Sequence, residues 1–478
     1  MQHNHRSLLF FFLLVPFLAQ AQLQFGVRAD NHAGILSAGL NPALTAFHPY
    51  RWEVNLNGIA HFSQNNYAYL AQTGVLDLLG SGNSLDLDFG PDIRQDNLIP
   101  EGIVLDFFDD NQERYFASTT TIALPSILYK INDQHTVGLI AQTRVVLGGD
   151  NISDNFSYYN FNTRASYDTF PVPPVYGGLL AWTELGLHYS FRKNLPSGML
   201  SLGITAKYLM GQEGGYFYTD RRHRMSRLPF KGLGGTPVGI RFAYTNTLFT
   251  EDRYQPTLNG TGLGLDLGLS YIITNGAEAY SWKLGVALLD LGAIQFDQSA
   301  FNHTIDLQEP GTLDGRSFDF FQDLSDTEAI IDTFSSQLLG FAGASLTGNS
   351  FTQNLPAKLS FQLDHRINDH FYVGALFVQP LRLSDNAVPE GSLFVAAPRY
   401  ESRWIGVSMP VQLYRGENLQ LGLALRLGPL YIGSENLGSF GVQDQFSGTD
   451  FYAGLRLGPW LFRKATSGAG KNPACPSF

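Results

Sequence analysis

Charged side chains recur at alternate positions within apolar, glycine-rich segments of this sequence. In an extended chain alternate positions share one face, so acids and bases would gather on the face opposite to leucine, valine and isoleucine. Groups of both signs on one face can line a water-filled pore, or can form ion pairs that cross-link a filled interior. The residues concerned are Glu53, Arg144, Glu184, His188, Arg192, Lys207, Asp266, Lys283, Lys358, Asp364, Arg426 and Arg456.

Catalytic motifs are missing from the sequence. It has no Gly-x-Ser-x-Gly turn, no His-Glu-x-x-His pair and no phosphate-binding loop. We interpret His188 as a hydrogen-bonded interior residue and not as a general base, because no nucleophile pattern accompanies it. The sequence therefore predicts no enzyme, no cofactor and no metal centre.

Two charged clusters fall in segments without strand periodicity. The acidic one contains Asp106, Asp109, Asp110, Asn111 and Glu113, and the basic one contains Arg221, Arg222, His223, Arg224 and Arg227. The acidic spacing lacks the central Gly and terminal bidentate Glu of a calcium loop, so a solvated loop is favoured. The arginines can grip lipopolysaccharide phosphates through bidentate contacts, with an ordinary solvated loop as the alternative.

The element that must carry the alternating charges is the β-strand. In residues 262–274 leucines occupy every second position from 263 to 269, while Gly, Asp and Ser fill the positions between them. This period of two predicts a strand with one apolar and one small or polar face. Similar segments are residues 52–62, 115–131, 137–147, 179–192, 199–211, 280–296, 358–364, 371–383, 404–413, 419–427 and 451–457. Pro125 and Pro410 are expected to interrupt two of them.

The connections between these strands alternate in length. Short ones at 132–134, 193–198, 275–279, 366–369 and 415–418 alternate with long ones at 63–114, 148–178, 212–260, 297–356, 384–398 and 433–449. Short periplasmic turns and long outer loops are typical of outer-membrane barrels. We therefore predict an all-β, transmembrane, antiparallel up-and-down β-barrel of about 12 strands, or about 14 if residues 239–249 add a hairpin. Residues 326–339, in the longest loop, are predicted to form a short helix.

The N-terminus indicates export. Arg6, an apolar run at 8–18 and the small-x-small site Ala19-Gln20-Ala21 predict a signal peptide over residues 1–21. With no apolar segment of helical-span length, the chain is expected in the outer membrane of a Gram-negative bacterium.

Composition agrees with a barrel. The chain of 478 residues has 50 Gly, 36 Phe and 22 Tyr but only 15% charged residues, which suits strands exposed to lipid. Its single cysteine, Cys475, permits no internal disulfide, and the net charge of -11 argues against a nucleic-acid partner. The expected partners are membrane lipid and lipopolysaccharide, with another envelope protein at the outer loops as a further option.

Several short motifs resemble those of known outer-membrane barrels. They are Gly39-Leu40-Asn41-Pro42-Ala43, Leu124-Pro125-Ser126 with Tyr129, Leu355-Pro356, Phe371-Tyr372, Trp404-Ile405-Gly406-Val407-Ser408 and Leu425-Arg426-Leu427-Gly428-Pro429. In this order they resemble an uncharacterised outer-membrane barrel family of Bacteroidota. Asn41-Pro42-Ala43 is also similar to a motif of the long-chain fatty-acid transporter superfamily, which includes the shuttle barrel of the type nine secretion system. The resemblance implies a barrel whose N-terminal segment enters the lumen as a plug, and it implies no activity.

The expected organisation is a plug segment at 22–50, a barrel at 51–462 and a periplasmic tail at 463–478. The inward charges argue against a greasy lining, and we favour the interpretation in which they hold plug and wall together. Function then divides between a passive transporter, or plugged channel, for a small or amphipathic molecule and a non-catalytic envelope assembly barrel. Transport predicts a cavity or a wall opening, whereas an interaction role predicts a sealed lumen with exposed apolar loop residues, for which the helix at 329–339 is a candidate.

Overall fold

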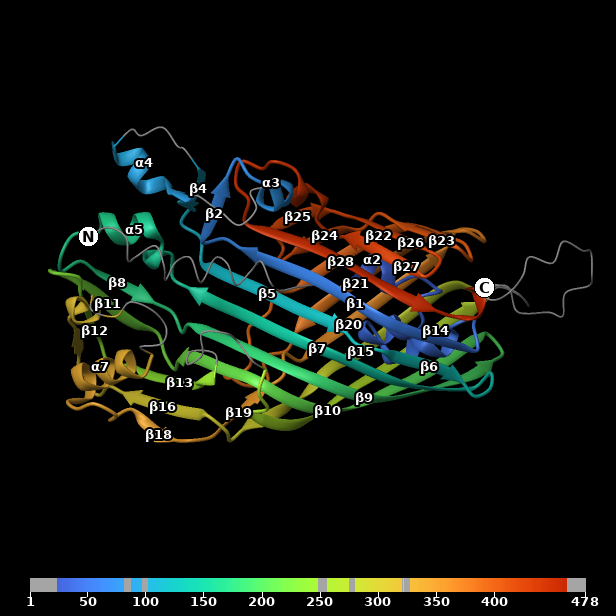
Figure 1. Ribbon diagram of the computed structural model, residues 1–478, viewed down its shortest axis with the longest axis horizontal. Helices are drawn as coiled ribbons and strands as arrows, with labels where there is room; N and C mark the ends of the chain where they lie inside the picture. Colours follow the sequence, from blue (N-terminus) through green and yellow to red (C-terminus); the bar gives the residue numbers. More distant parts are fainter. Residues whose placement is uncertain are drawn as a thin grey trace, which may run out of the picture.

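The strands of this protein close into a barrel. The computed structural model describes residues 24–80, 87–96, 102–247, 256–274, 280–319, 321 and 327–461; the predicted signal peptide, the turn at 275–279 and the tail at 463–478 lie outside them. β1 (Trp52–Asn65) pairs with β28 (Gly448–Leu457) on one side and with β5 (Arg114–Ala123) and β6 (Ser126–Lys130) on the other (Figure 1). The closed sheet leaves no free edge, which is what hydrocarbon surroundings require.

Across the described residues the wall has fourteen strand positions, all antiparallel to their neighbours, and some are shared by collinear pieces. In order they are β1; β5 with β6; β7 (His135–Ile152); β9 (Tyr176–Leu195); β10 (Gly198–Thr219); β13 (Gly239–Thr245) with β14 (Gly260–Thr274); β15 (Tyr280–Phe296) with β16 (Ala300–Asp306); β18 (Leu346–Gly348) and β19 (Phe351–Asn354) with β20 (Lys358–Arg366); β21 (Phe371–Pro380); β22 (Leu393–Glu401); β23 (Ile405–Ser408) with β24 (Val411–Tyr414); β25 (Asn418–Leu421) with β26 (Leu423–Leu427); β27 (Leu430–Ser434); and β28. The predicted interruptions at Pro125 and Pro410 fall between β5 and β6 and between β23 and β24.

Side chains alternate across the wall as the period of two requires. On β10, Leu202 and Ile204 are exposed on the outer surface, whereas Thr205 and Lys207 are buried. An apolar outer surface around a polar interior is the arrangement of a membrane-spanning barrel, so the predicted fold class is confirmed.

The strand count corrects two expectations. Two strands beyond the twelve predicted segments bring the number of wall positions to fourteen. They are β22, which begins inside the connection predicted at 384–398, and β27, which was not predicted. Within the described part of the predicted hairpin at 239–249, β13 pairs with β10 and β16, and so extends the wall position of β14 instead of adding a hairpin.

The long connections are not plain loops, because they build two small sheets at one end of the barrel, which we call the cap (Figure 1). One sheet contains β8 (Thr169–Val172), β11 (His223–Leu228), β12 (Gly232–Gly235) and β17 (Gly311–Leu313), and the other contains β2 (Ala68–Ala71), β3 (Leu87–Phe89) and β4 (Ile103–Phe107). The associated helices are α3 (Val75–Gly80), α4 (Gly90–Asp96), η4 (Asp154–Phe156), α5 (Tyr158–Thr163), η5 (Gly315–Phe318), α7 (Thr327–Leu339) and η7 (Leu437–Phe440); η8 (Pro459–Leu461) follows β28.

Two details of the cap differ from expectation. The helix predicted at 326–339 exists as α7, but its apolar residues pack inward: the Phe334 and Phe318 rings lie 4.7 Å apart, and Leu338 packs against Ile305. The short turn at 415–418 lies at the capped end and not opposite it, since Arg415 pairs with Asp150 at the far end of β7. No helix among the described residues is long and apolar enough to cross a membrane.

Candidate functional site

Residues 24–50, which we call the inner segment, precede β1 and lie inside the barrel. They form three short helical turns, α2 (Phe25–Arg28), η2 (Gly34–Gly39) and η3 (Pro42–Phe47). The last turn starts where its sequence requires: the Asn41 side chain accepts a hydrogen bond from the Ala43 N–H, and Pro42 fills the first helical position. The motif Asn41-Pro42-Ala43 is thus a helix start within the lumen.

Asn41 also fastens the inner segment to the wall. It is fully buried, and its Nδ2 donates to Leu269 O at 3.0 Å, to Val286 O at 3.2 Å and to Gln362 Oε1 at 2.8 Å. These acceptors belong to β14, β15 and β20. One amide therefore bridges three neighbouring wall positions.

Glycines let the backbone of the inner segment approach the wall. A Cβ on Gly203 would lie 2.3 Å from Ala43 N, and one on Gly268 would lie 2.1 Å from Asn41 Oδ1. Both distances are too short for any side chain, so glycine is required at these two positions for close packing.

His188 lies where the wall meets η3. Its Nε2 is 2.7 Å from Thr45 Oγ1 and its Nδ1 is 2.9 Å from Thr205 Oγ1, and Thr45 also contacts Ser190 at 2.8 Å. Each ring nitrogen thus has a hydroxyl partner and neither has a carboxylate. This environment is that of a structural interior histidine.

An ion pair and hydrogen bonds join the first half of the inner segment to β15, β22 and β26. Arg426 Nε lies 2.8 Å from Asp30 Oδ2, and Lys283 Nζ donates to Asn31 Oδ1 at 2.7 Å. Asn31 Nδ2 in turn donates to Glu401 Oε2 at 2.8 Å. Two of the predicted lumen residues, Lys283 and Arg426, therefore act on the inner segment directly.

Arg456, Arg192 and Asp364 are further residues of the predicted interior set, and Asp364 pairs with Arg399 at 2.8 Å. Arg456 Nη1 donates to His32 O at 2.8 Å and lies 3.4 Å from Glu53 Oε1, so it also holds the inner segment. Arg192 is buried beside the turn at 131–134, where its backbone N–H donates to Gln134 O at 2.8 Å, and it joins none of the ion-pair groups.

One group has ligand atoms close enough for a metal ion. Atoms of Asp30, His32 and Glu401 all lie within 4.8 Å of one another. However, Arg426 already forms an ion pair with Asp30, and Arg399 Nε lies 2.9 Å from Glu401 Oε1. The arginines already supply the positive charge that a metal ion would bring.

A second ionic group, which we call the wall cluster, lies deeper in the lumen. Its members are Arg144 on β7, Glu184 on β9, Lys207 on β10, Asp266 on β14, Asp290 on β15, Lys358 on β20 and Glu390 before β22. Asp290 Oδ1 lies 2.8 Å from both Arg144 Nη1 and Lys207 Nζ, and Lys207 lies 2.8 Å from Asp266 Oδ2. Five residues of the predicted interior set meet here: Arg144, Glu184, Lys207, Asp266 and Lys358.

A β-bulge aims Asp290 at this cluster. The β14–β15 register shifts between Leu265 and Leu267, and Asp290 has φ 56° and donates its N–H to Asp266 Oδ1 at 2.8 Å. A non-glycine residue with positive φ inside a strand is uncommon, and such strain is kept where the surroundings require it. The bulge reverses the parity of β15, so that Asp290 points inward and not towards lipid.

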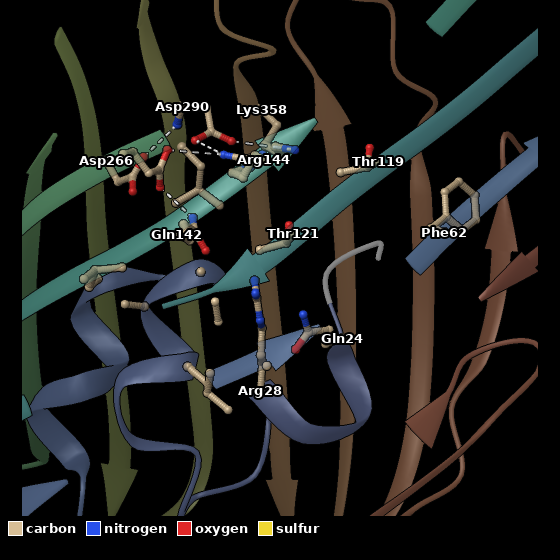
Figure 2. Close-up of a pocket in the computed structure, with 18 of the residues that line it drawn as sticks. Gln24, Arg28, Phe62, Thr119, Thr121, Gln142, Arg144, Asp266, Asp290 and Lys358 are labelled. Carbon is tan, nitrogen blue, oxygen red and sulfur yellow. Dashed lines mark hydrogen bonds and ion pairs between the residues drawn. The ribbon is translucent and has the colours of Figure 1, made fainter. Parts of the chain in front are cut away.

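The wall cluster borders a cavity of about 120 Å³ inside the lumen (Figure 2). The inner segment supplies Gln24 and Arg28 to one side of it, and β5 supplies Thr119 and Thr121. Figure 2 shows the Arg28 side chain rising from the inner segment towards Thr121, with Phe62 on the side away from Asp290 and Lys358.

Arg28 differs from the other cations of this cavity. Among the residues that the structure describes, no acceptor or carboxylate lies within bonding distance of its guanidinium, and its Nε is buried without a hydrogen bond. Burial lowers the pKa of Arg28 to about 10, which leaves the guanidinium charged at neutral pH. An unpaired charge therefore faces the cavity from the inner segment.

Most side chains of the two charged loop clusters form contacts within the protein. Arg221 pairs with Asp220 at 2.6 Å, Arg224 donates to Thr169 O at 3.2 Å, and Arg227 donates to the Asn162 carbonyl at 2.7 Å; Arg222 is exposed. In the acidic cluster Asp106 accepts from Tyr159 at 2.6 Å and pairs with Arg94, and Asp110 pairs with Arg114 at 2.6 Å. These contacts stabilise the cap.

Sequence reasoning missed three residues of the cavity: Arg28, Asp290 and Glu390. Asp290 had a signal, because adjacent Leu288 and Leu289 break the alternation shortly before Gly292, and an isolated glycine within a strand indicates a bulge. Arg28 and Glu390 lie in non-periodic segments, where no pattern gives the direction of a side chain.

One protein family and several solved structures are similar to this chain. A family model described as "Family of unknown function (DUF5723)" matches residues 42–435, and no curated protein matches the chain. A Pseudomonas aeruginosa FadL homologue is similar at 14% identity and a TM-score of 0.41, covering 92% of this chain and 98% of that one. A deletion mutant of the TodX monoaromatic hydrocarbon channel is similar at 10% identity and a TM-score of 0.39, covering 89% and 94% of the two chains.

Proposed function

The chain belongs to the DUF5723 family of unknown function, and from the geometry of the lumen we propose that it is a plugged outer-membrane conduit for a small or amphipathic molecule. In this proposal residues 22–50 are the plug and residues 51–462 are the conducting wall. The cap faces outward and residues 463–478 form a periplasmic tail. The outer membrane of a Gram-negative bacterium is the compartment that suits a closed barrel of this kind.

The observation that carries the proposal is the polar attachment of the inner segment. Its contacts with the wall include the Asp30–Arg426 pair, the Asn31–Glu401 hydrogen bonds and the Arg456–His32 hydrogen bond. Water can replace such contacts, because a hydrogen bond to a charged group contributes only about 1.5–3 kcal/mol beyond its exchange with water. The cavity beside the segment already provides part of a path.

Single-channel conductance in a planar bilayer tests this proposal. The mature chain and a version without residues 22–50 are refolded and compared, together with the double variant Arg426→Met, Arg456→Met, which keeps the segment but removes two of its anchors. We expect a closed wild type, an open deletion version and a double variant that opens intermittently. If the folded deletion version conducts no current, the lumen is sealed by the wall itself and the proposal is wrong.

A second candidate, an envelope interaction barrel, is favoured by exposed apolar residues on the cap. Leu76 and Leu79 of α3 are 62% and 73% exposed, and Val442 beyond η7 is 63% exposed. Exposed apolar residues that lie together mark protein contact sites. Under this proposal, Leu76→Asn with Leu79→Asn abolishes a complex seen by blue-native electrophoresis of native membranes and leaves conductance unchanged. An unchanged electrophoretic species would reject it.

A further inference from the structure

The charges around the lumen cavity do not balance within the wall. The wall cluster contributes four carboxylates, from Glu184, Asp266, Asp290 and Glu390, and three cations, from Arg144, Lys207 and Lys358. Each of these three cations lies within 4.0 Å of a carboxylate of the cluster. With its ordinary charges the wall side therefore carries one excess negative charge.

The balancing charge stands on the other side of the cavity. Arg28 of the inner segment points towards the wall (Figure 2) and has no ion-pair partner among the described residues. A positive and a negative group thus face each other across open space without touching. Two buried, separated charges of this kind are costly unless something polar lies between them.

Two amides of the same cavity also lack partners. Gln24 is 5% exposed and Asn55 is 1% exposed, and Gln24 Oε1 and Asn55 Oδ1 are buried without hydrogen bonds in the described part of the chain. Both atoms are acceptors, so they require donors. The Arg28 guanidinium is a donor and requires an acceptor.

Part of the cavity lining is apolar. Phe62, Val378 and Leu393 line this part. Phe62 lies on the side away from Asp290 and Lys358 (Figure 2). The cavity volume of about 120 Å³ is below the roughly 150 Å³ of a cavity that holds one benzene molecule, so the space fits a ligand of about six non-hydrogen atoms.

We propose that this cavity binds a small zwitterion with an apolar side chain, of the amino-acid type, with its carboxylate on Arg28 and its ammonium group towards the wall cluster. The carboxylate supplies the acceptor that Arg28 needs, and the ammonium group meets the excess negative charge of the wall cluster. A simple anion satisfies Arg28 but faces the acidic wall, and a simple cation does the reverse. The inference rests on the proposed conduit, since it names the class of molecule that the conduit admits.

Three ligands with one short carbon skeleton separate these cases. Isothermal titration of the refolded mature protein in detergent at pH 7.5 uses alanine, propionate, which lacks the ammonium group, and ethylamine, which lacks the carboxylate; 2-aminobutyrate serves as a second zwitterion. We expect alanine or 2-aminobutyrate to bind at least tenfold more tightly than either singly charged ligand. Equal binding of propionate, equal binding of ethylamine, or binding of none of the four overturns the proposal.

Arg28→Gln tests the assigned contact, with Arg222→Gln on the cap as the control of equal charge change. We expect Arg28→Gln to weaken zwitterion binding at least tenfold, and Arg28→Lys and Arg222→Gln to keep it within a few fold. Unchanged binding in Arg28→Gln contradicts the assignment. If Arg28→Gln does not fold, the comparison of ligands on the wild type still decides.

The two proposals can fail separately. Zwitterion binding by a protein whose deletion version stays closed keeps the site and removes the conduit. Conductance on deletion without zwitterion binding keeps the conduit and removes the site.

Discussion

At the scale of single residues, Asp290 joins cations of three different strands. It lies 2.8 Å from cations of two different strands and 3.8 Å from Lys358. It achieves this only because the bulge gives it a positive φ, a conformation that Asp and Asn tolerate better than most residues. The local strain is compensated by the cations that it joins.

Replacement of Asp290 should therefore be severe. Asp290→Asn keeps the shape and the tolerance of positive φ but leaves buried cations without their shared carboxylate, and we expect a loss of about 3–5 kcal/mol in the free energy of unfolding. Urea titration in detergent, followed by tryptophan fluorescence, measures this loss. The exposed Asp297→Asn is the control, and equal stability of the two variants would contradict the role given to Asp290.

Asn41 is the second residue whose contribution can be isolated. Asn41→Ala removes a helix cap and leaves wall carbonyl groups with one donor fewer, so we expect a loss of about 1–3 kcal/mol. The same urea titration serves, with Asn194→Ala at the exposed end of β9 as the control. A stability within error of wild type would show that water replaces the amide.

The residues show how far sequence alone reaches. Parity along a strand puts Glu184, Lys207 and Asp266 on the inward face, and all three side chains are buried, because side-chain direction in a regular strand follows position. The same rule fails for Asp290, since one extra residue in a bulge reverses every later direction. The parity rule does not apply to Arg28, because the direction of its side chain depends on how the inner segment folds against the wall.

At the scale of elements, the contact between η3 and the strands β10 and β14 depends on shape. Gly203 and Gly268 leave a flat strip on the inner wall, and the Pro42–Ala43 backbone lies on it at distances that exclude any side chain. Close packing of this kind fixes the depth of the inner segment in the barrel.

Gly203→Ala should displace η3 from this strip. The added Cβ would overlap backbone atoms of Pro42 and Ala43, and overpacking of this size costs about 1–3 kcal/mol. We expect lower stability and a higher open probability in the bilayer assay than for the wild type. Gly348→Ala on β18, where a Cβ meets no atom within 4 Å, is the control. A closed and stable Gly203→Ala would mean that η3 yields without consequence.

Strands with a long, regular alternation of side chains could be predicted from sequence, and short irregular strands could not. Long strands such as β9 and β10 carry many alternations and stood out, whereas β27 has five residues after Gly428 and Pro429, and β22 contains Pro398. The cap strands are shorter still: β8 contains Pro171 and β12 is Gly-Leu-Gly-Gly. Short strands of this kind owe their existence to their neighbours and leave no pattern of their own.

At the scale of the whole molecule, exposed apolar side chains occur in two different surroundings. On the wall, Ile204 is 40% exposed and Leu202 51% exposed, and in our assignment both contact lipid. On the cap, Leu79 is 73% exposed and contacts water. The exposed fraction does not distinguish the two surroundings, but the free-energy cost of placing a charged side chain there does.

Arginine substitution should separate the two surroundings. Ile204→Arg places a charge against hydrocarbon and should cost up to about 2–4 kcal/mol, whereas Leu79→Arg should change stability by less than about 0.5 kcal/mol. Folding efficiency into lipid vesicles, read from heat-modifiable gel mobility, measures both. Equal effects at the two sites would mean that the β10 surface does not face lipid.

The inner segment also dictates an order of events during assembly. Its partners lie at the other end of the chain: Asn31 bonds to a residue 370 positions later, Asp30 to one 396 later and His32 to one 424 later. Contacts between such distant residues form late, because the intervening chain must first be ordered. The inner segment therefore stays undocked and exposed until β26 and β28 have formed. Closure of the β1–β28 seam and docking of the inner segment then become a single step, in which the barrel closes around a segment that was synthesised before any of its strands.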